Sequence, residues 1–148
     1  MQRNERYHKR WKMIGIDTNI LVRYLTQDDK VQSKLAGKII DQYVSKSQSI
    51  FINNIVMCEL VWVLNRGYKY KKEQIASVLR QIFSTTEFAF EHQSILWEAL
   101  DEYENKDLDF SDALIAGVND NHECKKTFTF DQSASQNSNF ELLQIDNE

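Results

Sequence analysis

The chain has 148 residues, which fits one domain with one hydrophobic core. Its formal net charge of −4 argues against binding of nucleic acid by bulk electrostatics, so any RNA would require bound cations or local basic patches. Two cysteines are too few for a disulfide framework and no segment has the length and apolarity of a membrane span, so we expect a cytoplasmic protein.

Residues 1–12 form a basic N-terminal extension, which we expect to be disordered, and a coherent pattern begins at residue 13. From there to residue 148 the sequence predicts a single domain in which short strands alternate with helices. We expect strands over 13–16, 49–52, 88–90, 127–130 and 140–145, and helices over 18–25, 31–43, 55–65, 73–83, 93–103 and 110–118. This alternation is typical of an α/β domain with a mainly parallel sheet, here of five strands, which binds ligands at the carboxyl ends of its strands.

Three of the predicted helices have informative apolar patterns. The helices over 31–43 and 73–83 each have an apolar stripe, which could form a dimer seam or a groove for a partner protein, although core packing is the simpler interpretation. The helix over 55–65 is apolar almost all round, so it should be deeply buried.

Two carboxylates in the first half of the chain have unusual surroundings. Asp17 ends the first strand, where it could either serve a functional site or cap the next helix. Glu59 has only apolar residues three and four positions away, so a buried Glu59 would need a cation or a distant basic partner. The alternative is a helix that leaves one edge in solvent.

Two more carboxylates stand out in the second half. Asp112 has only Asp109, of the same sign, as a charged neighbour within one helical turn. A structural alternative is that Asp109 caps the helix and Asp112 interacts with the helix dipole. Asp131 closes the fourth strand, where a simple turn aspartate is the alternative.

Taken together, these four acids predict a metal site. Asp17 and Asp131 follow strands, and Glu59 and Asp112 lie near the starts of helices that can lean over the same edge of the sheet. Four convergent carboxylates would repel one another strongly unless divalent cations lay between them. Oxygen ligands of this kind favour Mg²⁺ or Mn²⁺, and such sites serve hydrolysis or transfer at a phosphate.

At four places the sequence resembles the motifs of the PIN-domain family, and in particular of VapC-like toxin ribonucleases of type II toxin–antitoxin systems. The similar segments are MIGIDTNIL at 13–21, ELVWVL at 59–64, DFSDALIA at 109–116, and TFD at 129–131 with FELL at 140–143. They occur in the family's order, and the similarity runs from residue 13 to about residue 145.

The resemblance implies a three-layer α/β/α sandwich around a parallel sheet, a Mg²⁺- or Mn²⁺-dependent endoribonuclease, and a homodimer. For VapC-like members it also implies a cognate antitoxin whose tail blocks the active site. By position, the acidic cluster would consist of Asp17, Glu59, Asp112 and Asp131. Asp109 would be either a fifth member of the acidic cluster or a group that lies just outside the metal ligands. The side chains that orient water at the metal would be Thr18, Asn19 and Thr129.

Other interpretations stay open at this point. The basic turn after the third predicted helix could contact RNA or be a solvated connection; its charged residues are Arg66, Lys69, Lys71 and Lys72. An enzyme that uses Asp17 as a phosphate-accepting nucleophile is a rival, but Asn19 stands where such enzymes usually have a second acid. A third possibility is a binding module that has lost its activity. The presence of all four acids argues against this possibility.

Overall fold

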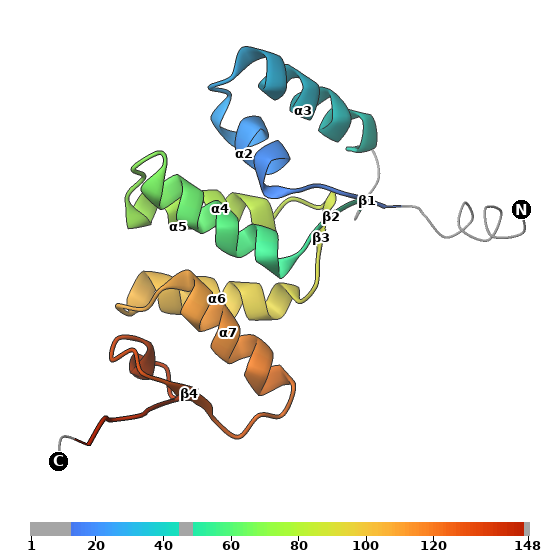
Figure 1. Cartoon of the computed structure of the whole chain (residues 1–148). Coiled ribbons are helices and arrows are strands. Elements are labelled where there is room, and N and C mark those ends of the chain that lie inside the picture. Colours follow the sequence, from blue (N-terminus) through green and yellow to red (C-terminus); the bar gives the residue numbers. More distant parts are fainter. Residues whose placement is uncertain (1–12, 45–48, 147–148) are drawn as a thin grey trace, which may run out of the picture. The chain divides into compact units, whose positions relative to one another are not determined.

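The computed structural model describes residues 13–44 and 49–146, so the disorder expected for residues 1–12 lies outside the described part of the chain. Within these ranges the structure is of the α/β type and has six α-helices and parallel strands. Figure 1 shows the course of the chain through these elements. The chain divides into two compact units. The first comprises the residues up to Val63 together with Ser84–Glu91, and the second comprises Leu64–Phe83 and the residues from His92 onward. None of the described helices combines the length and the apolarity needed to cross a membrane.

The first unit contains a parallel sheet of three strands, which are β1 (Ile14–Gly15), β2 (Ile50–Ile52) and β3 (Phe88–Phe90). β2 is the middle strand, and its Ile50 lies opposite residues of both neighbours. Ile50 and Ile52 have no exposed surface, so the face of the sheet that they share is covered, and Phe51 on the other face is half-buried. All three strands point the same way, so their carboxyl ends lie along one edge of the sheet.

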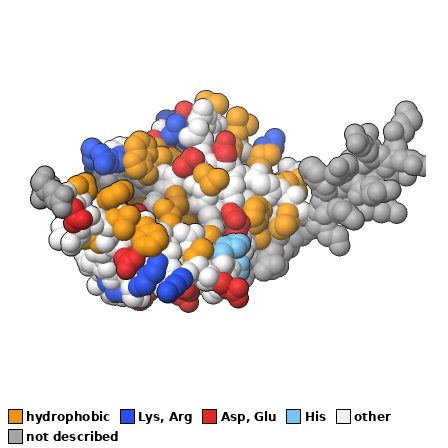
Figure 2. Space-filling view, turned by 60° about the horizontal axis from the view of Figure 1, so that its bottom comes forward, with side chains coloured by type: hydrophobic (Ala, Val, Ile, Leu, Met, Phe, Trp, Pro, Cys, Tyr) orange, Lys and Arg blue, Asp and Glu red, His pale blue; other side chains and the backbone are white. Residues whose placement is uncertain are grey.

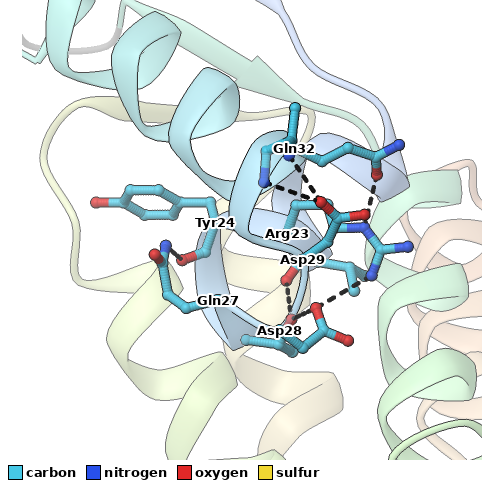
Figure 3. A network of polar contacts seen from close by, with 9 residues as sticks. Arg23, Tyr24, Gln27, Asp28, Asp29 and Gln32 are labelled. Atoms are coloured by element: carbon cyan, nitrogen blue, oxygen red, sulfur yellow. Dashed lines mark hydrogen bonds and ion pairs between the residues drawn. The ribbon is translucent and has the colours of Figure 1, made fainter.

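A polar network fixes the turn between α2 (Thr18–Thr26) and α3 (Lys30–Tyr43), as Figure 3 shows. Arg23 forms an ion pair with Asp28, with 3.1 Å between Nη1 and Oδ1, and its Nε donates to Gln32 Oε1 at 2.8 Å. Gln27 ends α2 in the left-handed region, with a φ of 58°. These contacts hold the end of α2 against the start of α3 and so set the direction of α2.

The surface of α3 differs from the expected pattern. Ser33, Ala36 and Ile40 are buried, whereas Val31 and Leu35 are 70% and 59% exposed. The helix therefore buries a face made of two small residues and Ile40, and leaves most of its apolar stripe in solvent. Exposed hydrophobic side chains also occur elsewhere: Figure 2 shows them in orange, interspersed with charged and other polar groups, on the face that it draws.

α4 (Asn54–Arg66) follows β2 and begins in the first unit. Its residues Met57, Leu60 and Leu64 have no exposed surface, but Ile55 and Trp62 are 68% and 64% exposed. The expectation that this helix is deeply buried is therefore wrong for one face. Hydrophobicity alone could not show which face packs, because apolar residues occur all round the helix.

The second unit contains α5 (Lys72–Phe83), α6 (Gln93–Asn105) and α7 (Phe110–Asn121), with α6 packed between the other two. The stripe on α5 is core, because Ile75 and Leu79 have no exposed surface. α6 and α7 approach closely at Gly117, where an added Cβ would lie 2.7 Å from Ile95 Cγ2. The apolar stripe of α5 is thus used inside the fold and is not a surface for a partner.

The remaining strands, β4 (Thr127–Thr129) and β5 (Phe140–Leu142), form a second parallel sheet. A short 3₁₀ helix, η1 (Ala134–Gln136), lies between them, and the buried Asn137 donates to Glu102 Oε2 at 2.5 Å. The expected single five-stranded sheet inside a sandwich is therefore wrong, since the described strands form sheets of three and two. β1 is only two residues long and pairs with β2, and β4 pairs with β5. The single domain over residues 13–148 stays a prediction.

Candidate active site

Asp17 and Thr18 lie where the chain passes from β1 into α2. Asp17 Oδ1 accepts a hydrogen bond from the backbone N–H of Ile20 at 3.0 Å, so Asp17 is the N-cap of α2. Thr18 is 8% exposed, and its Oγ1 donates to Glu59 Oε2 at 2.8 Å. The capping interpretation of Asp17 is therefore correct, and it is compatible with a second role because the exposed side chain also lines a pocket.

Glu59 lies in the second turn of α4, on the same exposed face as Ile55 and Trp62. The side chain is exposed, so the idea of a buried carboxylate without a partner is wrong. The structure shows the alternative, a helix with one edge in solvent. The hydrogen-bond partner of Glu59 is the hydroxyl of Thr18, a neutral group that leaves the negative charge in place.

An open pocket of about 260 Å³ brings Asp17 and Glu59 together. Its wall comes from the segments that follow β1 and β2 and from α4, and the lining residues are Asp17, Thr18, Asn19, Asn53, Ile55, Val56, Glu59 and Val63. The pocket thus lies at the carboxyl ends of two parallel strands, where α/β sheets bind ligands. It combines carboxylate, hydroxyl and amide groups with an apolar helix surface.

Two polar residues at this edge were not among the predicted site residues. Asn53 follows β2, lines the pocket, and accepts a hydrogen bond from the N–H of Val56 at 2.9 Å. Glu91 follows β3, and its Oε1 accepts from the N–H of Asn54 at 2.7 Å. The available signal was position, because each residue directly follows a strand and so lies at the same edge of the sheet as Asp17. Both side chains hold the first turn of α4 and so orient the helix that bears Glu59.

In the second unit, Asp112 lies in the first turn of α7 and Asp109 occupies the N-cap position. Asp109 makes no side-chain capping hydrogen bond, so the capping interpretation is not supported for this residue. Burial raises the pKa of the Asp112 carboxyl, and the negative charges of Asp109 and Asp131 raise it further. The ionised form of Asp112 is therefore in an unfavourable environment that a cation would improve.

Asp131 follows β4 and is exposed. Its Oδ1 accepts hydrogen bonds from the hydroxyl and the N–H of Ser133 at 2.7 and 2.9 Å, and its own N–H donates to Thr129 Oγ1 at 3.0 Å. The Ser133 hydroxyl, and then the Ser133 N–H, lower the pKa of the Asp131 carboxyl. The turn interpretation of Asp131 is thus correct, and the turn also keeps this carboxylate ionised beside Asp112.

The basic turn between α4 and α5 is only partly available to a ligand. Lys72 Nζ donates to the carbonyl oxygen of Lys106 at 2.9 Å and lies 5.1 Å from the centre of the Tyr103 ring. Lys72 therefore has a structural use, and its contact with RNA is not needed to explain its position. The exposed basic residues of the turn are Arg66, Lys69 and Lys71, for which RNA contact stays a prediction.

The four predicted acids fall into two pairs, Asp17 with Glu59 and Asp112 with Asp131, and each pair has oxygen donors suited to a hard divalent cation. Asp17 and Glu59 share a pocket in the first unit, and Asp112 is influenced by Asp109 and Asp131 in the second. Over residues 13–44 and 49–146, no group of three or more Asp, Glu, His or Cys side chains is arranged to hold a metal ion. The donor chemistry of both pairs and the raised pKa of Asp112 fit Mg²⁺ or Mn²⁺. Convergence of all four carboxylates stays a prediction.

Comparison with known proteins identifies the family. The chain is 28% identical over 100 residues to a VapC ribonuclease of Aquifex aeolicus (strain VF5), an alignment that covers 67% of this chain and 73% of the relative. The family model of the PIN domain matches residues 14–139, which include both strand ends and both helices that bear the acids. This chain belongs to the PIN-domain family.

Proposed function

We propose that the chain is a Mg²⁺- or Mn²⁺-dependent endoribonuclease that cleaves RNA phosphodiester bonds, and that it is the toxin of a toxin–antitoxin pair. The observation that supports this function best is the pocket in which Asp17 and Glu59 meet at the carboxyl ends of β1 and β2. Family membership and the similarity to a VapC ribonuclease support the reaction class. The RNA substrate also favours a cytoplasmic location.

In this proposal the carboxylates of Asp17, Asp112 and Asp131 hold the metal, in one nuclease domain over residues 13–148. A bound Mg²⁺ or Mn²⁺ supplies charge stabilisation at the phosphate and makes water more acidic. Glu59 helps to position the metal or the attacking water. Thr18 holds the Glu59 carboxylate through its hydroxyl, and Ser133 keeps Asp131 ionised. Asn19 and Thr129 stay candidates for orienting water, and Asp109 for an added ligand.

Cleavage of total RNA in Mg²⁺, Mn²⁺ or EDTA tests the reaction. We expect cleavage with either metal, none in EDTA, and a loss of about 100-fold or more in the Asp112→Asn variant. Asp120→Asn is the matched control, because Asp120 is an exposed aspartate on the same helix, α7, and makes the same change in charge. Cleavage that persists at full rate in EDTA would overturn the metal mechanism.

A second experiment tests whether the two pairs of acids serve one site. Mn²⁺ binding is followed by electron paramagnetic resonance in the wild type and in Asp17→Asn and Asp112→Asn variants. If the pairs act together, each variant weakens binding of the same ion. If Asp17→Asn binds Mn²⁺ as the wild type does, Asp17 is a helix cap without a metal role.

We also propose a homodimer and a cognate antitoxin whose tail enters the active site. The exposed stripe of α3 supports a protein contact, because Val31, Leu35 and Ile39 are 70%, 59% and 42% exposed on successive turns of the helix. Light scattering of Leu35→Glu tests whether this stripe holds a second copy. A dimeric wild type and a monomeric Leu35→Glu variant are expected, with Lys34→Glu, an exposed change next in sequence, as the control.

A further inference from the structure

One exposed aromatic side chain lies on α4, the helix that bears Glu59. Trp62 is 64% exposed in the middle of a regular helix, α4. No ring contact or cation–π contact involves it within residues 13–44 and 49–146. Trp97 differs, since it is 36% exposed and its ring lies 5.4 Å from that of Phe83. A large aromatic side chain that leaves most of its surface in solvent is informative, because this exposure is unfavourable unless another molecule covers it.

Trp62 does not itself line the pocket, but it lies on α4, the helix that contributes Glu59 and Val63 to the lining. It lies three residues after Glu59 on α4, so the two side chains are neighbours on the helix surface, with about 5–6 Å between their Cβ atoms. Side chains of a helix lean toward its N-terminus, which for Trp62 is the direction of the turn that bears Glu59. On the opposite side of Glu59 in sequence, Ile55 is 68% exposed and lines the pocket. The carboxylate is therefore flanked by apolar surface along an open helix face.

We propose that Trp62 stacks on an unpaired base of single-stranded RNA next to the phosphate that is cleaved, which makes it a substrate-positioning residue. The inference rests on the proposed ribonuclease function. Stacking suits this protein, because the formal net charge of −4 offers RNA little general attraction, whereas an aromatic ring binds the face of any base without needing positive charge. In a duplex the bases already cover one another, so an exposed indole selects single strands.

The test measures binding separately from cleavage. A short fluorescein-labelled single-stranded RNA, and the same strand annealed to its complement, are titrated with protein in Mg²⁺, and every protein has the Asp112→Asn change so that the RNA stays intact. We expect Trp62→Leu to weaken binding of the single strand by about 5- to 150-fold and to leave duplex binding unchanged. Trp62→Phe keeps a ring and should stay within about threefold of its parent.

Trp97→Leu is the matched control, since it removes the same side chain from another helix, and thermal melts show whether each variant is folded. Equal single-strand affinity in Trp62→Leu and its parent would overturn the proposal, as would equal losses on single strand and duplex. If Trp62→Leu instead changes only the oligomeric state in light scattering, the face contacts protein and the proposal is wrong. The proposed ribonuclease function is tested separately: it is wrong if the wild type does not cleave RNA.

Discussion

Thr18 and Glu59 are joined by a hydrogen bond of 2.8 Å, from Oγ1 to Oε2, across 41 positions of the sequence. Thr18 is buried at the start of α2, and Glu59 is exposed on α4. The bond therefore connects an exposed carboxylate to a rigid part of the first unit. A long side chain that would otherwise sample several rotamers in solvent is held toward the pocket that it shares with Asp17.

Removal of this hydroxyl should affect catalysis more than folding. In Thr18→Val the side chain keeps its shape but Glu59 loses its donor, and because Glu59 is solvated the loss of stability should stay below about 1 kcal/mol. We expect kcat/KM for RNA cleavage to fall by about tenfold, which corresponds to the lower end for a hydrogen bond to a charged group. Thr18→Ser restores the hydroxyl and should restore the rate. Equal rates in the valine and serine variants would show that the bond does not position Glu59.

The raised pKa of Asp112 predicts a stability that depends on pH. A carboxyl whose pKa is higher in the folded protein favours folding when it is protonated, and this contribution is lost as the pH rises through the folded pKa. At neutral pH, Asp112→Asn should therefore raise the melting temperature of the metal-free protein, by less than about 1 kcal/mol in free energy because the group is partly solvated. Below about pH 4 the difference should vanish, since both side chains are then neutral.

Melting curves in EDTA across this pH range check the prediction, and Asp120→Asn controls for the general effect of charge removal. A lower melting temperature for Asp112→Asn at neutral pH would mean that the helix dipole outweighs burial and the neighbouring acids at this position.

Ser133 should control the ionisation of Asp131. Its hydroxyl is the main cause of the lowered pKa, so Ser133→Ala should raise the pKa of the Asp131 carboxyl while the backbone donors keep part of the effect. Carboxyl carbon resonances followed by NMR during an acid titration measure this shift directly. Ser135→Ala is the control, because that hydroxyl donates to the backbone oxygen of Gln132. An unchanged Asp131 titration in Ser133→Ala would exclude the hydroxyl as the cause.

Two helical glycines should respond in opposite directions to alanine. An added Cβ at Gly37 in α3 meets nothing within 4 Å, so Gly37→Ala should gain up to about 1 kcal/mol from helix propensity. At Gly117 the Cβ would lie 2.7 Å from Ile95 Cγ2, and overpacking of about 1–3 kcal/mol should outweigh that gain. Chemical denaturation of both variants measures the difference. Stabilisation by Gly117→Ala would show that α6 and α7 separate easily.

The sequence was sufficient for features that depend on local patterns. The helix that begins after Asp17 and the turn at Asp131 both follow from a strand end next to a residue that caps or turns. The expected parallel pairing of short strands is also present in β1, β2 and β3. Local chemistry determines these elements, so one sequence is enough to predict them.

Features that depend on packing could not be obtained in this way. The exposed face of α4, with Glu59 and Trp62, is set by the neighbours of its other face, and its apolar residues occur on all sides. The exposure of the apolar stripe of α3 is likewise set by which face of the helix its neighbours cover. The number of sheets depends on which strand edges meet, and a pattern of strands and helices does not specify it. Asn53 both caps the first turn of α4 and lines the pocket, and the second role depends on how the strand ends meet in space.

The first unit is discontinuous, since its third strand, β3, comes only after the segment Leu64–Phe83. During synthesis on the ribosome, β2 therefore emerges before β3. The backbone groups of β2 that pair with β3 have no strand partner until Phe88–Phe90 has also emerged. A nascent chain that stops earlier has both pocket carboxylates, Asp17 and Glu59, but lacks Glu91, which anchors the first turn of α4. The contact of Glu91 with the first turn of α4 thus becomes available only after the middle of the polypeptide has been made, although all residues that line the pocket precede it.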